Sequence, residues 1–330
     1  MKKINIAILA IGLFAIACST DRTILREVKP IGQTETPTTP VEEPETPTTP
    51  VETKEEFKSI DKAVLAKLGS QTEKKTIKSQ DDLPFVGSQG TEVWLYPQDL
   101  RMPDGSAVTY PIEIEMLELF TPKDMILHQM PTVSRGRLLT TAGEMNIRAY
   151  KNGQELKLNK YNSTQIVVPV KRELDNDMWL FYGEPTNLEG NEFIDWYSAD
   201  SSKREDGGRL FPRKEDYVIF PSRIGWINCD RFYNFKEAKT VVTFSSENPP
   251  VENILIYLYF PDIKSLMQVY KETSGEVPVG QTVKVIAVGI TKNEEYRTFY
   301  QEMVVQDKQK VEIKLTPTTK EAFLQHLDTL

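Results

Sequence analysis

The sequence predicts an all-β fold of two β-sandwich-like modules, with a short helix before the first module and a short C-terminal helix. Short apolar segments recur at near-regular spacing, with turn residues and no helical segments between them, which is typical of sandwiches. Many of these segments alternate apolar and polar residues, as strands with one buried face do. A length of 330 residues, 39% of them hydrophobic, is enough for two medium-sized modules.

The chain opens with the parts of a bacterial lipoprotein signal peptide, which we expect to span residues 1–17. Lys2 and Lys3 precede the apolar stretch 4–16, which is shorter than the ~20 residues that cross a bilayer as a helix. Small residues then precede Cys18, and a polar run follows it, which resembles the lipobox of lipoprotein signal peptidase. The alternatives are an ordinary cleaved signal with a chance cysteine, and an uncleaved anchor.

The lipobox resemblance implies that Cys18 carries acyl chains and that the membrane is a partner of the protein. Two or more chains bind a bilayer firmly, at about 0.8 kcal/mol per buried methylene. Ser19 follows the cysteine, whereas aspartate is usual in an inner-membrane retention signal. We therefore expect a lipid-anchored protein of a Gram-negative cell envelope, at the outer membrane, with its periplasmic or surface face left open.

Residues 18–56 form the next region, which is rich in Thr, Pro and Glu. The eight residues 35–42 are repeated at 45–52. This composition cannot bury a core, so we expect a disordered, extended tether. Its threonines also permit O-glycosylation.

A short docking helix is expected over 57–68. Phe57, Ile60, Val64 and Leu68 fall on one helical face. Gly69 then supplies a stop signal. A linker segment without stable helix is the alternative.

The first β module is expected to extend over 57–235, including the docking helix. The Asn152-Gly153 pair lies between two alternating segments and is a strong hairpin signal, because both residues tolerate positive φ. The expected strands are 92–96, 112–116, 145–150, 155–158, 165–170, 178–182 and 217–220.

A long polar segment, 183–215, interrupts these strands and is expected to be a structured loop over one end of the sheet. It carries the possible binding residues Trp196, Tyr197, Asp195 and Asp200. The aromatic rings could stack on sugars while the carboxylates bind hydroxyl groups. Aromatic residues of β proteins are more often part of the core, and this is what we expect of Trp179, because it lies in an alternating strand.

The second β module is expected over 236–330. Its segment 254–260 is apolar throughout, which indicates a strand buried on both faces. Phe323, Leu324 and Leu327 indicate the short C-terminal helix. The other expected strands are 240–244, 283–289, 296–305 and 311–315.

Composition argues against several classes of function. The formal charge of −8 and the pI near 5.2 argue against nucleic-acid binding, which needs a basic surface. The histidines, His128 and His326, are far apart, and the sequence has no HExxH, CxxC or G-x-S-x-G motif. We therefore expect no metal, no cofactor and no enzymatic activity.

Trp226, Asn228, Cys229, Asp230 and Arg231 are expected to form a structural junction between the modules. With Cys18 acylated, Cys229 has no disulfide partner, and we expect a buried, unreactive thiol. A catalytic interpretation would make it a nucleophile, but no histidine is near it in the sequence. Arg231 is expected to pair with a carboxylate, of which Asp230 is one candidate, and to tie the modules together.

Glu113 and Glu115 are expected on the same face of one strand. A glycosidase uses a pair of carboxyl groups, one with a raised pKa and one that stays ionised. Neighbouring glutamates on an exposed strand face are more often a solvated surface, and this is the interpretation that we favour.

A series of motifs after residue 70 resembles a family of uncharacterised envelope lipoproteins of Gram-negative bacteria. The first module is also similar, more distantly, to the β-sandwich modules of netrin receptors and ankyrins. The resemblance implies the fold and the envelope location, and no biochemical activity. The motifs are Gly90-Thr91, Asp104-Gly105, Lys123-Asp-Met-Ile126, Thr132-Val-Ser134, Leu139 to Gly143, Phe181-Tyr-Gly183, Trp196 and Gly225-Trp-Ile-Asn-Cys-Asp-Arg-Phe232.

Two hypotheses of function follow. The first is a non-catalytic envelope lipoprotein that binds another envelope protein or supports a surface assembly. The second is a carbohydrate-binding or carbohydrate-active lipoprotein that uses the segment 183–215.

Overall fold

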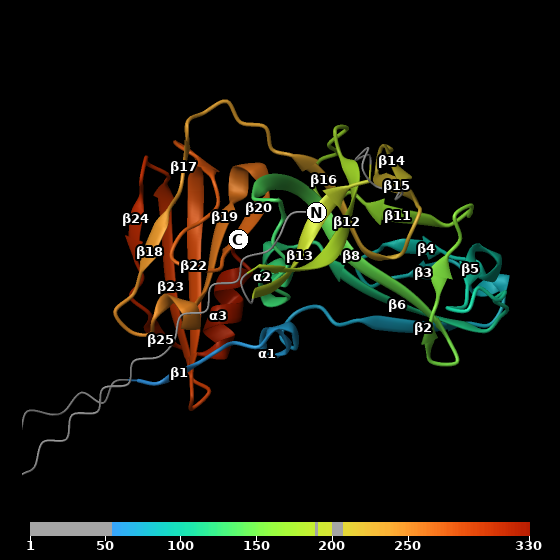
Figure 1. Cartoon of the computed structure of the whole chain (residues 1–330), viewed down its shortest axis with the longest axis horizontal. Helices are drawn as coiled ribbons and strands as arrows, with labels where there is room; N and C mark the ends of the chain where they lie inside the picture. The colour runs from blue at the N-terminus through green and yellow to red at the C-terminus, as the bar shows by residue number, and fades with distance from the viewer. Residues whose placement is uncertain (1–54, 189–190, 200–206) are drawn as a thin grey trace, which may run out of the picture. The chain divides into compact units, whose positions relative to one another are not determined.

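The strands of the computed structural model form two β-sandwiches that pack against each other (Figure 1). The structure describes residues 55–188, 191–199 and 207–330. The all-β, sandwich-like fold expected from the sequence is therefore confirmed. The expected signal peptide 1–17, with Cys18 after it, and all but the last two residues of the expected tether 18–56 lie outside the described residues.

The first sandwich consists of a larger sheet and a facing sheet. The larger sheet has the order β13-β12-β16-β8-β6-β2, with bounds Asn191–Ser198, Trp179–Leu188, Gly225–Phe232, Arg137–Lys151, Ile112–Leu119 and Glu73–Ile77. The facing sheet has the order β14-β15-β11-β4-β3, with bounds Gly208–Pro212, Asp216–Pro221, Gln165–Pro169, Glu92–Trp94 and Phe85–Val86. Short strands pair at the margins: β7 (Val133–Ser134) and β9 (Gln154–Glu155) with β8, and β10 (Lys157–Leu158) with β5 (Leu100–Arg101).

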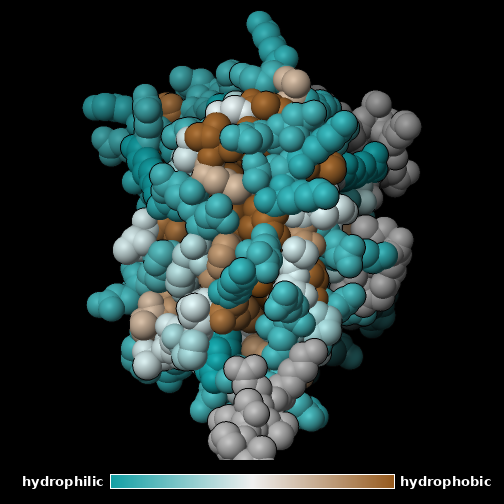
Figure 2. Space-filling model, turned by 90° about the vertical axis from the view of Figure 1, so that its left-hand side faces the viewer, coloured by the Kyte–Doolittle hydropathy of each residue, from teal (hydrophilic) through white to brown (hydrophobic). Residues whose placement is uncertain are grey.

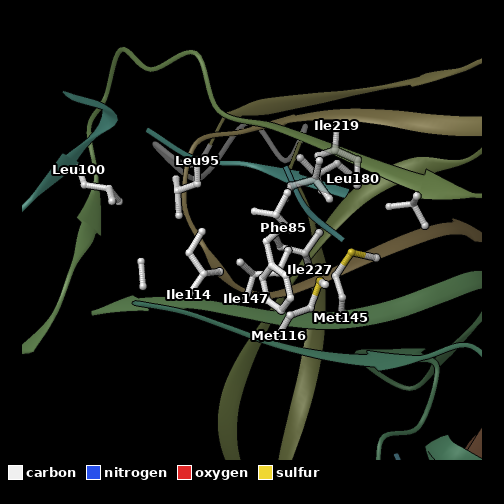
Figure 3. Close-up of a cluster of buried hydrophobic side chains, with 14 of the residues drawn as sticks. Phe85, Leu95, Leu100, Ile114, Met116, Met145, Ile147, Leu180, Ile219 and Ile227 are labelled. Atoms are coloured by element: carbon white, nitrogen blue, oxygen red, sulfur yellow. The ribbon is translucent and has the colours of Figure 1, made fainter. Parts of the chain in front are cut away.

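The core of the first sandwich lies between these two sheets (Figure 3). Ile114, Met145 and Ile227 project into it from the larger sheet, and Phe85 and Ile219 project from the facing sheet. Each of these residues is at most 4% exposed. The alternation in the sequence thus gives each sheet one apolar face, and the two apolar faces meet.

The second sandwich has one large sheet, of order β20-β19-β22-β23-β25, with short strands over one face. Its bounds are Ser265–Val269, Leu255–Phe260, Thr282–Thr291, Tyr296–Val304 and Thr316–Thr318. Strand β1 (Phe57–Lys58) also pairs with β22. The short strands are β17 (Lys239–Thr240) with β21 (Val277–Pro278), and β18 (Thr243–Ser245) with β24 (Lys310–Glu312).

Strand β19, between β20 and β22, is buried on both faces, as its continuous apolar sequence predicts. Ile256 and Leu258 point into the core of the second sandwich. Tyr257 and Tyr259 point to the other side, into a separate core between the two sandwiches. This inter-sandwich core binds the two halves of the chain together.

Three helices of the described residues close the inter-sandwich core: α1 (Lys62–Ala66), α2 (Pro122–Leu127) and α3 (Lys320–Leu327). They contribute the fully buried side chains of Leu65, Ile126 and Phe323. Helix α3 confirms the expected C-terminal helix. Helix α2 was not predicted, although Thr121 supplies a capping signal: its hydroxyl accepts a hydrogen bond from the Asp124 N–H, with proline at the first position of the helix.

The expected helix over 57–68 is wrong at its first residues. Phe57 and Lys58 form strand β1, which pairs with Thr291 and Ile290 of β22. The helix begins only after Asp61, whose side chain caps it by accepting a hydrogen bond from the Ala63 N–H. Apolar spacing alone does not distinguish this strand-and-helix arrangement from one longer helix.

The expected loop over 183–215 is also wrong. Strand β12 continues to Leu188 and forms a hairpin with β13, and β14 follows at Gly208–Pro212. Backbone hydrogen bonds hold these strands, so polar side chains on an outer strand do not prevent it from forming.

The end of the molecule formed by the second sandwich is not uniformly polar. Seen from that end, hydrophobic residues gather in the middle of the face, and hydrophilic residues surround them (Figure 2). Val241 and Val304 are among the exposed apolar residues of this sandwich.

Candidate ligand-binding groove

Trp196 was considered as a residue that could stack on a sugar, but its buried position in the structure excludes this role. The side chain is 0% exposed, and its indole N–H donates to the Pro131 carbonyl over 3.0 Å. Its ring meets that of Trp226 edge-on, with centroids 6.3 Å apart. Gly183 lies opposite Trp196 on β12, and a Cβ at that position would come within 2.7 Å of Trp226 Cβ. The glycine therefore lets Ile194, Trp226 and the Trp196 ring pack closely against β12.

Two of the other possible binding residues, Asp195 and Tyr197, lie beside Trp196 on β13. Asp195 is 6% exposed, and its Oδ1 accepts from the backbone N–H groups of Arg135, at 2.9 Å, and Trp196, at 3.1 Å. Tyr197 is half-buried, with the Arg135 guanidinium 4.7 Å from the centroid of its ring. Asp200 lies outside the described residues. Asp195 is thus held in one orientation, and Tyr197 packs beneath a cation.

A groove runs between β13 and β20, which are the end strands of their sheets. We call it the hairpin groove. It consists of two adjoining hollows, of about 480 Å³ and about 400 Å³, which share Gln268 and Tyr270. Apolar side chains, including Phe193 and Met267, form most of the wall of the larger hollow, and Asp195 also lines it. Of the three possible binding residues that the structure describes, Asp195 alone lines this groove.

Gln268 on β20 and Tyr270, directly after β20, line the groove with polar atoms that have no hydrogen-bond partner among the described residues. Gln268 is 9% exposed, and its Oε1 accepts no hydrogen bond from the described residues. The hydroxyl group of Tyr270 likewise has no partner among them. Gln129, 4% exposed, leaves its Nε2 unpaired in the smaller hollow. A buried polar group without a partner costs about 1–3 kcal/mol, so these atoms favour a ligand that pairs with them.

The hydroxyl of Tyr270 is neutral at physiological pH. Burial, together with the nearby Asp195 carboxylate, raises the pKa of Tyr270 well above its ordinary value. The phenol can therefore both donate a hydrogen bond and accept one.

The predicted junction residues lie on β16, in the middle of the larger sheet of the first sandwich. Cys229 is 0% exposed and points into the core of that sandwich, as expected for a structural thiol. Burial, with a smaller effect of Asp230, raises the pKa of its thiol well above the ordinary value. Trp226, on the opposite face, packs on the inter-sandwich core.

Asn228 and Asp230 form a sealed cluster with Glu144 of β8. All three residues are 0% exposed. The Asn228 amide donates to Asp230 Oδ2 over 2.7 Å and to Glu144 Oε1 over 3.4 Å. Burial raises the pKa of both Glu144 and Asp230 well above their ordinary values, so both carboxyl groups favour the protonated form.

The expected roles of Arg231 need correction. Its partner is Asp175, with Nε and Oδ2 2.6 Å apart, and not Asp230. Asp175 belongs to the first sandwich, so the pair does not tie the modules together. Burial opposes the shift, but the hydrogen bond from Arg231 leaves the pKa of Asp175 below its ordinary value. The pair lines a cleft of about 600 Å³, which also contacts Lys264 of the second sandwich.

The remaining residues considered for chemistry have structural contacts. His128 Nε2 lies 2.9 Å from the Ser70 carbonyl, and the His326 ring stacks on Tyr300. Glu113 and Glu115 share one face of β6, and Glu115 pairs with Lys74. Trp179, expected in the core, is 56% exposed. Among the described residues, no three or more His, Cys, Asp or Glu side chains are grouped as metal ligands require.

Sequence reasoning missed Gln268, Tyr270 and Glu144. The only signal for Gln268 is a polar residue inside the apolar segment Ser265–Val269. Glu144 similarly interrupts a largely apolar part of β8. Neither signal identifies the residues from other strands that surround these side chains in the folded protein.

The fold and the groove define an all-β protein of two packed sandwiches with a candidate ligand-binding site between them. The chain matches no protein-family model and no curated protein. None of the helices in the described residues is long and apolar enough to cross a bilayer.

Proposed function

We propose that this chain is a non-catalytic binding protein of the Gram-negative cell envelope, anchored at the outer membrane by lipid on Cys18, and that it binds its partner in the hairpin groove. The observation that carries the binding function is the groove wall, where Gln268 and Tyr270 present polar atoms without partners. A mostly apolar hollow with a few oriented polar groups is the usual form of a ligand site.

The sequence of the N-terminus supports the anchor. The signal-like residues 1–17 end directly before Cys18, and the Thr/Pro/Glu-rich segment to residue 56 would set the folded body away from the membrane. The motifs that resemble envelope lipoproteins, above all Gly225 to Phe232, agree with this location.

Labelled palmitate tests the anchor. The wild-type chain should incorporate the label and fractionate with the outer membrane, whereas Cys18→Ala should do neither. Equal labelling of the two chains would overturn the proposed anchor.

A blocked groove tests the binding site. Thr186 lines the larger hollow, so Thr186→Trp should fill it, whereas Val304→Trp places the same side chain on an exposed strand of the second sandwich. The wild type and Val304→Trp should retain the same partner from envelope extract, and Thr186→Trp should lose it. Equal retention by all three chains would place the binding surface elsewhere.

Catalysis is tested separately with peptide, ester and glycoside substrates. We expect no turnover from the wild type. Turnover that disappears in Glu113→Gln, Glu115→Gln or Cys229→Ser would replace the binding proposal with an enzymatic one.

A further inference from the structure

We propose that the hairpin groove takes a neutral, hydroxyl-rich ligand, namely an oligosaccharide. This inference rests on the proposed function of the groove as a binding site and adds the chemical class of its ligand. It follows from which atoms lack partners, from their charge and from the walls around them.

The unpaired oxygen atoms of the groove require donors from the ligand, whereas Gln129 Nε2 in the smaller hollow requires an acceptor. Gln268 Oε1 is an acceptor only, and no described residue donates to it. Asp195 Oδ1 is already occupied by two backbone N–H groups, and none of the hydrogen bonds among the described residues uses its Oδ2. The Tyr270 hydroxyl completes the set, since it can donate or accept. A ligand hydroxyl suits all three groups, because it donates to an acceptor while it accepts from a neighbour.

The position of Gln268 is fixed by the strand that carries it. Leu266 lies on the face of β20 that points to the inter-sandwich core, whereas Met267 and Val269 lie in the core of the second sandwich. Alternation places Gln268 on the same face as Leu266, with Tyr270 next in line. The amide therefore reaches the groove from a rigid strand, which is how a preorganised site is built.

The unpaired groups favour a neutral ligand. Gln268 carries no charge, and the Tyr270 phenol stays protonated. The Arg135 side chain at the same hollow is directed over the Tyr197 ring, 4.7 Å from its centroid. Lys271 also lines this hollow, but a phosphate or sulfate would share the hollow with the Asp195 carboxylate.

The apolar wall suits the faces of sugar rings. The rings of Phe193 and Tyr270 lie 5.1 Å apart at an angle of 34°. The face of an aromatic ring carries partial negative charge and attracts the C–H groups that cover one side of many pyranose rings. The larger hollow, about 480 Å³, lies within the roughly 300–1,000 Å³ of small-ligand sites.

The test uses the purified full chain on an array of neutral oligosaccharides of glucose, galactose, mannose and N-acetylglucosamine, with sulfated and sialylated glycans and extended peptides beside them. We expect a neutral oligosaccharide to bind best. Gln268→Leu and Tyr270→Phe should each weaken that binding at least tenfold, and so should Phe193→Ala.

Tyr257→Phe is the matched control. Tyr257 is a fully buried tyrosine outside the groove, with its hydroxyl donating to the Ile126 carbonyl over 3.3 Å. Its removal should leave the Kd for the oligosaccharide within twofold of the wild type, once the variant is shown to be folded by circular dichroism. Gln268→Leu removes an unpaired buried amide, so loss of binding in that variant is not explained by unfolding.

Binding of only charged glycans or peptides would overturn the saccharide assignment, and so would oligosaccharide binding that all three groove variants retain. If no glycan binds but Thr186→Trp still abolishes retention of an envelope partner, the ligand class is wrong and the groove remains the binding site. If Thr186→Trp changes neither result, the proposed function itself fails.

Discussion

Buried polar side chains occur in two contrasting settings in this protein. The sealed cluster of Glu144, Asn228 and Asp230 has no exposed surface, and its members bond to one another. In the hairpin groove, Gln268 and Tyr270 are also largely buried, but they line a hollow that a ligand can enter. Both places contain polar atoms without hydrogen-bond partners. In the cluster these atoms can be stabilised only by protonation, whereas in the groove a ligand can supply the missing hydrogen bonds.

No ligand can reach the sealed cluster, so its unpaired carboxyl oxygens can be stabilised only by protonation. Two carboxyl groups share one amide donor group, and Glu144 Oε2 and Asp230 Oδ1 have no partner among the described residues. Protonation removes the charges and supplies O–H donors, so the cluster is linked to pH. In the groove a ligand can pair with the unpaired atoms. We therefore expect these atoms to destabilise the free protein and to contribute binding free energy when the ligand pairs with them.

The largest effect is expected from Asn228→Leu. This change removes the amide that bridges both carboxyl groups and leaves them buried without that donor, so the free energy of unfolding should fall by about 3 kcal/mol. Urea unfolding at pH 7 measures it. Gln268→Leu, the corresponding change in the groove, should cost nothing or stabilise. Equal destabilisation by the two variants would erase the distinction between the two settings.

The second prediction concerns pH. The unfolded carboxyl groups ionise near pH 4, whereas the folded cluster keeps its protons to a higher pH because its pKa values are raised. Above pH ~4 the folded state thus binds more protons than the unfolded state, and stability from this cluster falls as pH rises. The free energy of unfolding of the double variant Glu144→Gln with Asp230→Asn should therefore fall less than that of the wild type between pH 5 and pH 8. Parallel curves of unfolding free energy would show that the cluster does not titrate.

A pair of tyrosines gives the third prediction. Tyr257→Phe loses the hydrogen bond to the Ile126 carbonyl and should lower stability by about 1 kcal/mol. Tyr270→Phe removes an unpaired hydroxyl and should leave stability unchanged or raise it slightly. Thermal unfolding of the free protein compares them directly. A larger loss from Tyr270→Phe would mean that its hydroxyl is paired after all.

The smallest effect is expected from Arg231→Met. Arg231 follows the sealed cluster directly in the sequence, but it pairs with Asp175 where the two side chains remain 33% and 27% exposed. Water screens such a pair, so its loss should cost about 0.5 kcal/mol, and less at high salt. A cost near that of Asn228→Leu would show that the pair belongs energetically to the sealed cluster.

Much of the fold follows from local pattern. The alternating segments became strands, and the Asn152-Gly153 pair forms the expected turn, with φ of 51° and 76°. The apolar segment of β19 is buried on both faces because it separates two cores. Each of these predictions uses information held within a few neighbouring residues.

The two tryptophans of the β12–β13 hairpin show where local pattern fails. Trp179 was expected in the core and is exposed, whereas Trp196 was expected at a binding surface and is fully buried. A period of two separates the faces of a strand, but it does not say what covers each face. Here the second sandwich covers one face of the larger sheet, and no local signal predicts that contact.

The candidate site could not be predicted from the sequence, because it also depends on the contact between the two sandwiches. Asp195 was named for the carboxylate it offers, and it does line the groove. Gln268 and Tyr270 come from the other sandwich and meet it only through tertiary packing. Their missing partners are a property of the folded molecule, because the sequence shows a glutamine and a tyrosine without showing what surrounds them.

The pairing of β1 with β22 has a consequence for the order in which the molecule can assemble. Arg297 holds Glu55 across 242 residues of chain, next to the pairing of Phe57 with Thr291. Contacts of such separation cannot form until almost the whole polypeptide has been synthesised, and closing them is slow. During synthesis the first residues of the folded body must therefore remain unpaired until a strand near the C-terminus has been made. A chain truncated before residue 290 would leave them without a place to dock.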